Sequence, residues 1–314
     1  MIRYVAVRVL HILPVLLVSS IAIFLLLRLL PGNPADVLAG PDASPETVAA
    51  LRHQLGLDRP LLEQFGIWLL RVLRGDLGTS AFSHYPVSEL IGRRLWASGE
   101  LALVAMGVTL LVALPLGVMA ALRRGRLADF AASVYQSVLL AVPNFWFGIL
   151  AILLFSVTLG WLPPGGYIPM TDSVVGNLKS VLLPAVTLGL PTAAALIGIV
   201  RAAVIEELGK DYVRTAGAKG IAERRVVGIH VLRNAMGPVV VMLGVTLGRL
   251  IGASVVVEAV FSWPGIGSLL ISSIANRDYA IVQGTLLIFV LIIVLINLLT
   301  DVLHALIDPR IRLS

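Results

Sequence analysis

Charged side chains are concentrated in one segment of this chain, residues 211–235, with the sequence DYVRTAGAKGIAERRVVGIHVLRNA. A loop with this many charges could simply be a solvated connector. The segment also holds many apolar residues, namely Tyr212, Val213, Ala216, Ala218, Ile221, Val226, Val227, Ile229, Val231 and Leu232. A solvated connector would account for the charges but not for this apolar share. We therefore expect something to cover the segment.

Motifs for covalent chemistry are missing from the sequence. Gly209 and Lys210 are followed by Asp211, and no phosphate-binding G-x-x-x-x-G-K-[ST] loop occurs, so the chain cannot bind ATP in that manner. The five histidines are scattered and no H-E-x-x-H occurs, which argues against a metal site. No G-x-S-x-G nucleophile elbow is present either. An intramembrane enzyme therefore lacks support, and we expect no cofactor or metal bound by this chain.

A stripe of small residues is the second candidate site. In GVTLGRLIG, residues 244–252, Gly244, Gly248 and Gly252 recur every four residues, a spacing that lets two helix backbones approach closely. The stripe fits packing within this chain, and it fits equally a partner helix or a pore wall. Arg249 lies beside it and is costly in lipid unless it faces protein or water. A snorkelling or paired structural arginine and a substrate contact both remain open.

Composition places the chain in the membrane. Of its 314 residues, 58% are hydrophobic and only 13% are charged, against about 25% charged in soluble domains. Cysteine is absent, so disulfide and thiolate chemistry are excluded. The net charge is +6, but no basic tail points to nucleic acid. The class is an all-α, polytopic membrane protein, in contact with the lipid bilayer.

Six segments are long enough to span a bilayer, which needs roughly 20 mainly apolar residues. They are residues 9–30, 101–121, a stretch within 130–160, 180–200, 236–257 and 279–300. The first is too long and lacks a small-residue cleavage site, so we interpret it as an uncleaved anchor rather than a signal peptide. Prolines lie inside several spans (Pro14, Pro115, Pro143, Pro184 and Pro191), and they weakly favour helices bent around a cavity.

Basic residues predict the orientation. They gather before the first span, after the second, in residues 205–234 and at the C-terminus, whereas the loops 161–179 and 258–278 carry one each. The positive-inside rule then places both termini, including residues 1–8, and the loop 205–234 in the cytoplasm. The loop 31–96 is long and lies outside. Its leucines recur at helical spacing and Ser44 offers a helix start, so we expect two or three short helices there.

Two further expectations concern single residues. Gly220 divides the cytoplasmic loop into helical pieces of about 205–219 and 222–233, since glycine commonly ends a helix. Glu100, Glu258 and Asp301 lie at the ends of predicted spans, which favours solvation at the membrane interface or a helix-end role. A proton relay would need acidic groups in mid-span, so a proton-coupled transporter is poorly supported.

The segment 211–226 resembles the cytoplasmic loop of the dipeptide/oligopeptide permeases of ATP-binding cassette (ABC) importers. Further similar motifs follow in order along the chain: LLLRLLPGNPAD after the first span, LRGDLGTS at 73–80, PVSELIGRRLWASGELAL at 86–103, PNFWFG at 143–148, VVVEAVFSWPGIGSLL at 255–270, RDYAIVQG at 277–284 and the terminal DPRIR. The long outer loop is similar to that of the first, "B"-type, of the two permease subunits. The general importer signature has E-A-A before its glycine, where this chain has Arg214, Thr215 and Ala216, as in the R-T-A-x-A-K-G version of the peptide branch.

The resemblance implies a type I importer permease fold, with residues 97–314 as the permease domain and 205–234 as its coupling loop. It implies that helix 211–219 docks into an ATPase subunit, through Asp211, Tyr212, Arg214, Thr215, Ala216, Gly217, Ala218, Lys219 and Gly220. The implied partners are a second homologous permease, two cytoplasmic ATPases that hold ATP and Mg²⁺, and an external solute-binding protein. The implied location is the bacterial inner membrane.

The resemblance leaves the substrate open. A di- or oligopeptide is expected, while similar permeases import nickel chelates, glutathione or haem. A stand-alone secondary transporter is the rival class, which an inverted repeat and mid-span ionisable residues would favour. Neither feature is clear in this sequence.

Overall fold

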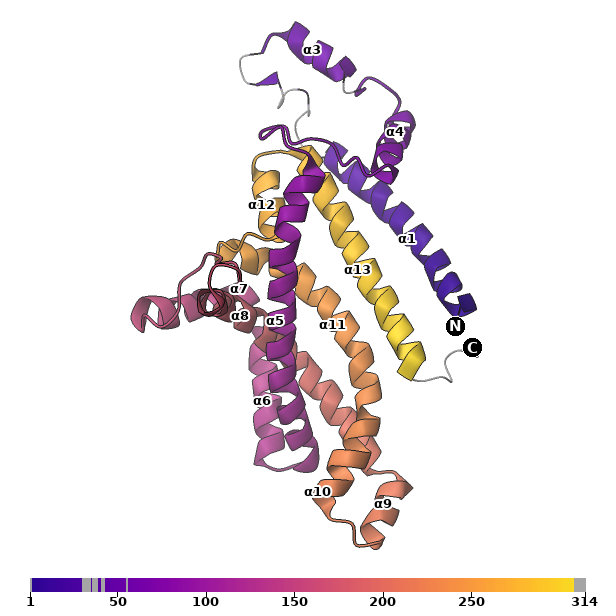
Figure 1. Ribbon diagram of the computed structural model, residues 1–314, viewed down its shortest axis with the longest axis vertical. Coiled ribbons are helices and arrows are strands. Elements are labelled where there is room, and N and C mark those ends of the chain that lie inside the picture. The colour runs from indigo at the N-terminus through magenta and orange to yellow at the C-terminus, as the bar shows by residue number, and fades with distance from the viewer. Residues whose placement is uncertain (1, 30–34, 36–38, 41–42, 55, 308–314) are drawn as a thin grey trace. The chain divides into compact units, whose positions relative to one another are not determined.

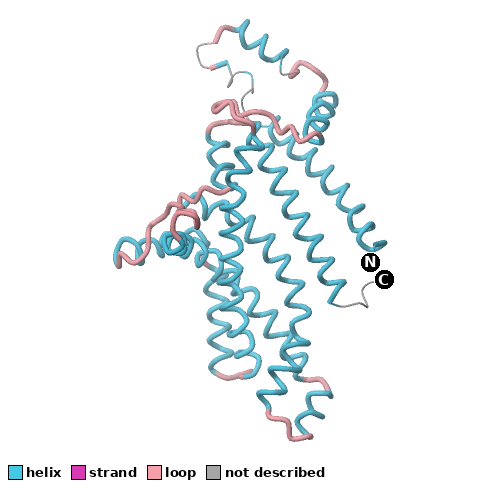
Figure 2. The backbone as a smooth tube through the Cα atoms, in the orientation of Figure 1, coloured by secondary structure: helices cyan, strands magenta, loops and turns pink. Residues whose placement is uncertain are grey.

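The computed structural model describes residues 2–29, 35, 39–40, 43–54 and 56–307, and these are helical apart from their connecting turns. Figure 2 shows the helices and loops of this part of the chain, to which an isolated bridge between Thr79 and Pro86 adds the only strand-like pairing described. Most of the predicted turn 31–36 and the terminal DPRIR motif lie outside the described residues. The all-α class predicted from composition is confirmed.

Five helices are long and apolar enough to cross a membrane (Figure 1). They belong to α1 (Ile2–Leu29), α5 (Val87–Leu122), α8 (Val174–Leu208), α11 (Leu232–Val260) and α13 (Tyr279–Ile307). Five of the six predicted spans are thereby confirmed by length and composition. Several helices run well beyond the apolar segment that predicted them, because polar helix formers continue the same hydrogen-bond ladder.

The third predicted span is broken. Helix α6 (Leu127–Ala141) is followed by α7 (Asn144–Ala151) and the π-helical turn η1 (Ile152–Thr158), and the two halves are bent by 99°. Pro143 lies at the break, and Val142 before it is extended (φ −92°, ψ 126°), as steric contact with a proline ring requires. This pair becomes a sixth span only if both halves count as one.

The region 31–96 contains the short helices α3 (Pro45–Gln54) and α4 (Leu61–Leu73) and the first turns of α5. The backbone N–H of Thr47 donates to the Ser44 hydroxyl over 3.3 Å, so the predicted helix start is confirmed. A further short helix, α12 (Ile266–Ala275), lies in the segment that we interpreted as a loop. The sequence contained a signal for this helix, namely the apolar residues Ile266, Leu269 and Leu270 at helical spacing.

The chain divides into two compact units, and their boundaries fall inside α5 and α13. The first unit comprises Gly99–Trp263 and the helical residues from Leu295 onward. Its core lies around α8, where Ile197 and Val200 are fully buried. Helices α5 and α8 pack closely, since a Cβ atom on Gly117 would lie 2.7 Å from the Val200 side chain.

The second unit comprises Ile2–Ser98 and Pro264–Val294. Its buried carboxylate, Asp278, accepts hydrogen bonds from the Ser80 hydroxyl over 2.6 Å and from the Ala81 backbone N–H over 3.1 Å. Gly284 of α13 packs against Val87 of α5, where a Cβ atom would lie 2.6 Å from the valine side chain. These contacts attach the segment after α4 to the start of α13.

Candidate functional site

The polar segment folds as one short helix between two long ones (Figure 1). Helix α8 ends at Leu208, and α9 covers Asp211–Ala218. The chain then continues through α10 (Glu223–Arg225) and the π-helical turn η2 (Val226–Val231) directly into α11. The predicted piece 205–219 was wrong in its start, because Lys210 is extended (ψ 149°) and separates the end of α8 from α9.

Gly220 ends α9 as predicted. Its φ is +75°, in the left-handed region that glycine adopts without a Cβ penalty. Its N–H donates to the Gly217 carbonyl over 2.9 Å, and the N–H of Ile221 reaches back to the Ala216 carbonyl over 3.3 Å. These two bonds form a Schellman motif, which reverses the chain immediately after the helix.

A buried carboxylate ties α9 to the end of α8. Glu207 is only 8% exposed, and it accepts hydrogen bonds from the Lys210 ammonium and, over 2.8 Å, from the Tyr212 hydroxyl. The Asn234 side chain donates to the same hydroxyl over 3.3 Å, so α11 joins the network. The hydrogen bond with Glu207 raises the pKa of Lys210, and burial raises the pKa of Tyr212. Lys210 therefore stays protonated around neutral pH and holds the pair together.

The apolar side of α9 faces its own chain. Val213, Ala216 and Ile221 pack against the buried cluster of the first unit. Val226, Val227 and Val231 of η2 are themselves buried. The segment is covered, as expected, and the chain's own helices cover most of its apolar residues. Ala218 and Ile229 stay exposed.

The opposite side of α9 is open to solvent. The exposed residues of the predicted docking set are Asp211, Arg214, Thr215, Gly217, Ala218, Lys219 and Gly220, and we call them the α9 outer face. Arg214 and Asp211 pair weakly across 3.6 Å. The remaining two of the nine predicted residues, Tyr212 and Ala216, are half-buried. Within the described residues no cluster of metal-ligating side chains occurs. Docking of a partner on the α9 outer face stays a prediction.

The three glycines of the α11 stripe differ in their packing. A Cβ atom on Gly244 would lie 1.6 Å from the Thr300 hydroxyl oxygen of α13, so this glycine is needed for packing within the chain. Gly248 and Gly252 have no such neighbour within 4 Å, and Arg249 is exposed. Packing within the chain therefore accounts for Gly244 only. A partner helix or a pore wall stays a prediction for the other two glycines and for Arg249.

Two acidic residues that we placed at the interface are buried. Glu100 is 6% exposed and lies inside α5, and Glu258 is fully buried in α11. Glu100 accepts hydrogen bonds from the Asn177 side chain over 2.6 Å and from the Tyr167 hydroxyl over 2.9 Å. Interfacial solvation was thus the wrong interpretation for both residues. Neutral donors contributed by distant segments satisfy Glu100, and the local sequence gave no sign of them.

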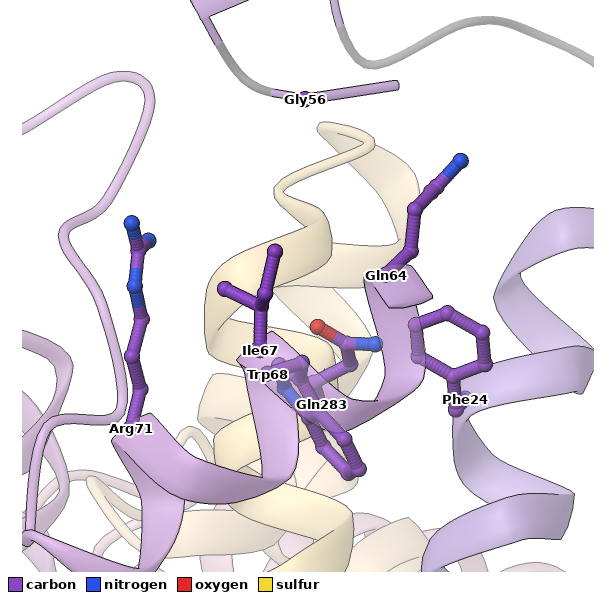
Figure 3. Close-up of a pocket in the computed structure, with 7 residues that line it drawn as sticks. All are labelled: Phe24, Gly56, Gln64, Ile67, Trp68, Arg71 and Gln283. Carbon is purple, nitrogen blue, oxygen red and sulfur yellow. The ribbon is translucent and has the colours of Figure 1, made fainter. Parts of the chain in front are cut away.

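A pocket that the sequence did not predict lies in the second unit, beside α4 (Figure 3). Its volume is about 150 Å³, and its lining combines aromatic, amide and guanidinium groups: Phe24, Gly56, Gln64, Ile67, Trp68, Arg71 and Gln283.

Comparisons with known proteins place these features in context. A family model described as "Binding-protein-dependent transport system inner membrane component" matches residues 113–313, and its N-terminal companion matches residues 1–94. A putative peptide transport system permease protein of Brucella abortus (strain 2308) is 44% identical over 305 residues, covering 97% of both chains. A glutathione transport system permease protein of Salmonella choleraesuis (strain SC-B67) is 42% identical over 312 residues, covering 99% of both.

A solved structure shares the fold. A chain of the MetNI methionine ABC transporter, in an inward-facing conformation, superimposes with a TM-score of 0.55 at 20% identity. The match covers 70% of this chain and 96% of the other. At this identity the likeness concerns the fold alone, and it confirms the predicted importer-permease architecture.

Proposed function

Because the chain belongs to the family of binding-protein-dependent transport system inner membrane components, we propose that it forms half of the translocation pathway of a peptide importer. The chain is a permease subunit, a multi-pass protein of the bacterial inner membrane without enzymatic activity of its own. The family works with ATPase and binding-protein partners. In our proposal these are two cytoplasmic ATPases, an external solute-binding protein and a second, related permease that forms the other half of the pathway.

The arrangement of α9 is the observation that supports this proposal most. The helix is short, its ends are fixed, and its inner side is covered by the chain itself. Its outer face stays free for a partner. A solvated connector would need neither the Schellman motif at Gly220 nor the buried anchor at Glu207. In our proposal the α9 outer face docks into the ATPase.

The anchor suggests how motion passes through the chain. Tyr212 of α9 binds Glu207 at the end of α8, and Asn234 at the start of α11 binds Tyr212. A displacement of α9 by a closing ATPase would therefore act on two membrane helices together. In the proposed mechanism this action switches the pathway between inward-facing and outward-facing states.

Peptides are proposed as substrate because the similar proteins named above carry peptide or glutathione transport in their names, and glutathione is itself a tripeptide. Nickel chelates and haem remain alternatives from the resemblance. Binding studies with the cognate external protein would decide among them, since that protein presents the substrate. If the external protein binds haem and no peptide, the proposed peptide substrate is refuted. The proposal that the chain belongs to an importer would still stand.

The docking proposal is tested with a glycine pair. Gly217 on the α9 outer face and Gly228 on η2 are both exposed, and an added Cβ atom at either position would have nothing within 4 Å. Gly217→Leu should reduce co-purification of the ATPases and substrate-stimulated ATP hydrolysis at least tenfold. Gly228→Leu, the matched control, should retain both. Full coupling in Gly217→Leu, or transport by the purified chain alone, would refute docking through α9.

A further inference from the structure

Helix α4 attaches to the first membrane helix through aromatic rings. Phe24 of α1 lies 5.4 Å from Phe65 and 5.7 Å from Trp68, measured between ring centroids. Phe65 and Trp68 also contact each other at 5.9 Å. These three rings fix one side of α4 against α1, and both helices belong to the second unit.

A second side of α4 is apolar and uncovered. Leu62 is 83% exposed and Leu73 is 74% exposed, and Leu61 and Leu70 are more than half exposed. Leu62 and Leu73 are eleven residues apart, which is three helical turns, so they lie on the same side. We call Leu62, Leu70 and Leu73 the leucine face. Exposed apolar patches of this kind mark a membrane or protein interaction site.

The contact with α1 sets the depth of this face in the membrane. Phe24 lies four residues before Arg28, the first charged residue after the apolar run of α1, which corresponds to about 6 Å along the helix axis. Trp68, which touches Phe24, is therefore at the edge of the hydrocarbon layer, where tryptophan is enriched. Leu70 and Leu73 are at most five residues from Trp68, about 8 Å along α4 at any tilt. Interfacial helices bury their apolar side to about this depth.

The neighbouring surface of α1 is apolar as well. Ile21, Leu25 and Leu26 are exposed at the same end of α1 as Phe24. Since α1 is a membrane helix, lipid covers these residues unless another helix does. The leucine face therefore lies on a helix that is attached, through Phe65 and Trp68, to an apolar part of a membrane helix.

The polar side of α4 borders the pocket shown in Figure 3, and its chemistry fits a phospholipid headgroup. Arg71 lines this pocket and has no acidic partner within the part of the chain that the structure describes. A guanidinium group binds phosphate oxygens in a bidentate manner. The Gln64 side chain also lines the pocket; it is 8% exposed, and its Oε1 atom is buried without a hydrogen-bond donor among the described residues.

We infer that α4 is an interfacial membrane helix whose leucine face enters the outer leaflet, and that the pocket at Arg71, Gln64 and Gln283 binds the headgroup of one phospholipid. The leaflet is the outer one in the orientation predicted from the basic residues. The inference does not depend on the substrate of the importer.

The absence of cysteine from the chain allows single-cysteine spin labels to measure depth. The importer, assembled with its partner subunits in vesicles of phosphatidylethanolamine and phosphatidylglycerol, would carry a label at Leu73→Cys. Leu17→Cys, at an exposed position of α1, gives the lipid reference, and Arg52→Cys, at an exposed charged position of α3, gives the water reference. The ratio of oxygen to nickel-chelate accessibility at position 73 should match the lipid reference within twofold. A ratio like that of position 52 would overturn insertion. A label shielded from both reagents would also overturn it, in favour of a protein partner.

The headgroup is tested separately with Arg71→Gln. Phosphatidylglycerol retained by the purified importer after detergent washing should fall by one lipid per chain, as counted by mass spectrometry. Arg52→Gln on α3, an exposed arginine away from the pocket, is the matched control and should retain the lipid. Equal retention in both variants would refute the headgroup site even if position 73 lies in lipid.

Discussion

Two surface segments of the first unit are held in different ways. Helix α9 is attached by side chains, through the bonds of Lys210 and Tyr212 to Glu207. The segment 161–173 is attached by its backbone: the Gly166 N–H donates to the Phe261 carbonyl over 2.9 Å. At Gly165 an added Cβ atom would lie 2.3 Å from the same carbonyl oxygen, so the two backbones are in direct contact.

Both segments also use a buried carboxylate, but the donors differ. Glu207 has a cationic partner in Lys210, whereas the described partners of Glu100 are the neutral Tyr167 and Asn177. Burial, together with the hydrogen bond to Glu100, raises the pKa of Tyr167 to about 12, and its ring packs edge-on against Trp263 at 4.7 Å. The segment 161–173 is therefore held by tight backbone and ring packing, which we call the wedge. Helix α9 is held by the side-chain bonds of Glu207, which we call the tether. A helix that is held by a few side-chain bonds and has an exposed outer face can shift when a partner binds it.

Gly165→Ala should have the largest effect, because the clash is with backbone that cannot rotate away. We expect a loss of about 3 kcal/mol in stability, near the upper end for overpacked sites. The melting temperature and the yield of the purified importer would measure it. Gly217→Ala in the tethered helix is the control and should change neither, since nothing lies within 4 Å of an added Cβ atom. Equal stability of both variants would refute the wedge.

Glu100→Ala should rank second. Removing the acceptor leaves the side-chain N–H of Asn177 and the hydroxyl of Tyr167 in need of new partners, at about 2 kcal/mol. Glu100→Gln keeps one acceptor and should recover a large part of the loss in thermal unfolding. A Gln variant as unstable as the Ala variant would mean that charge, rather than hydrogen bonding, matters at this position.

Gly220→Val should have a smaller effect on stability and a large one on coupling. A β-branched residue at φ +75° is strained by about 1–2 kcal/mol, and the strain would displace α9. Gly220→Asn is the matched control, since asparagine tolerates this conformation. Substrate-stimulated ATP hydrolysis should fall severalfold in the Val variant and stay near normal in the Asn variant. Loss of activity in both would argue that side-chain bulk, not backbone conformation, is excluded there.

Tyr212→Phe should have the smallest effect. It removes the hydroxyl that joins Glu207 to Asn234 and keeps the ring, at a cost of about 1 kcal/mol. Faster amide exchange in α9, with unchanged exchange in the segment 161–173, would show that the tether is local. Unchanged exchange in α9 would mean that Lys210 alone suffices as the tether.

The sequence determined the membrane class, five of the spans, the helix after Asp211 and its end at Gly220. Each of these depends on signals within a few residues: an apolar run of sufficient length, a glycine that tolerates positive φ, or a serine at a helix start. Such signals act through the hydrogen bonds of one helical turn, so the local sequence is enough to predict them.

Only the tertiary structure decided which residues are covered. Val213 and Ala216 pack against the core, while Arg214 is exposed. Gly244 packs against another helix of the chain, whereas Gly248 does not. Glu100 is buried and accepts a hydrogen bond from Tyr167. The tertiary structure also bent the third span by 99° at Pro143, where the sequence indicated a proline but not an angle. Burial and bending depend on neighbours that are distant along the chain, such as Thr300 for Gly244 and Asn177 for Glu100. Those neighbours become known only when the helices pack, because close packing joins segments that share no local hydrogen bond.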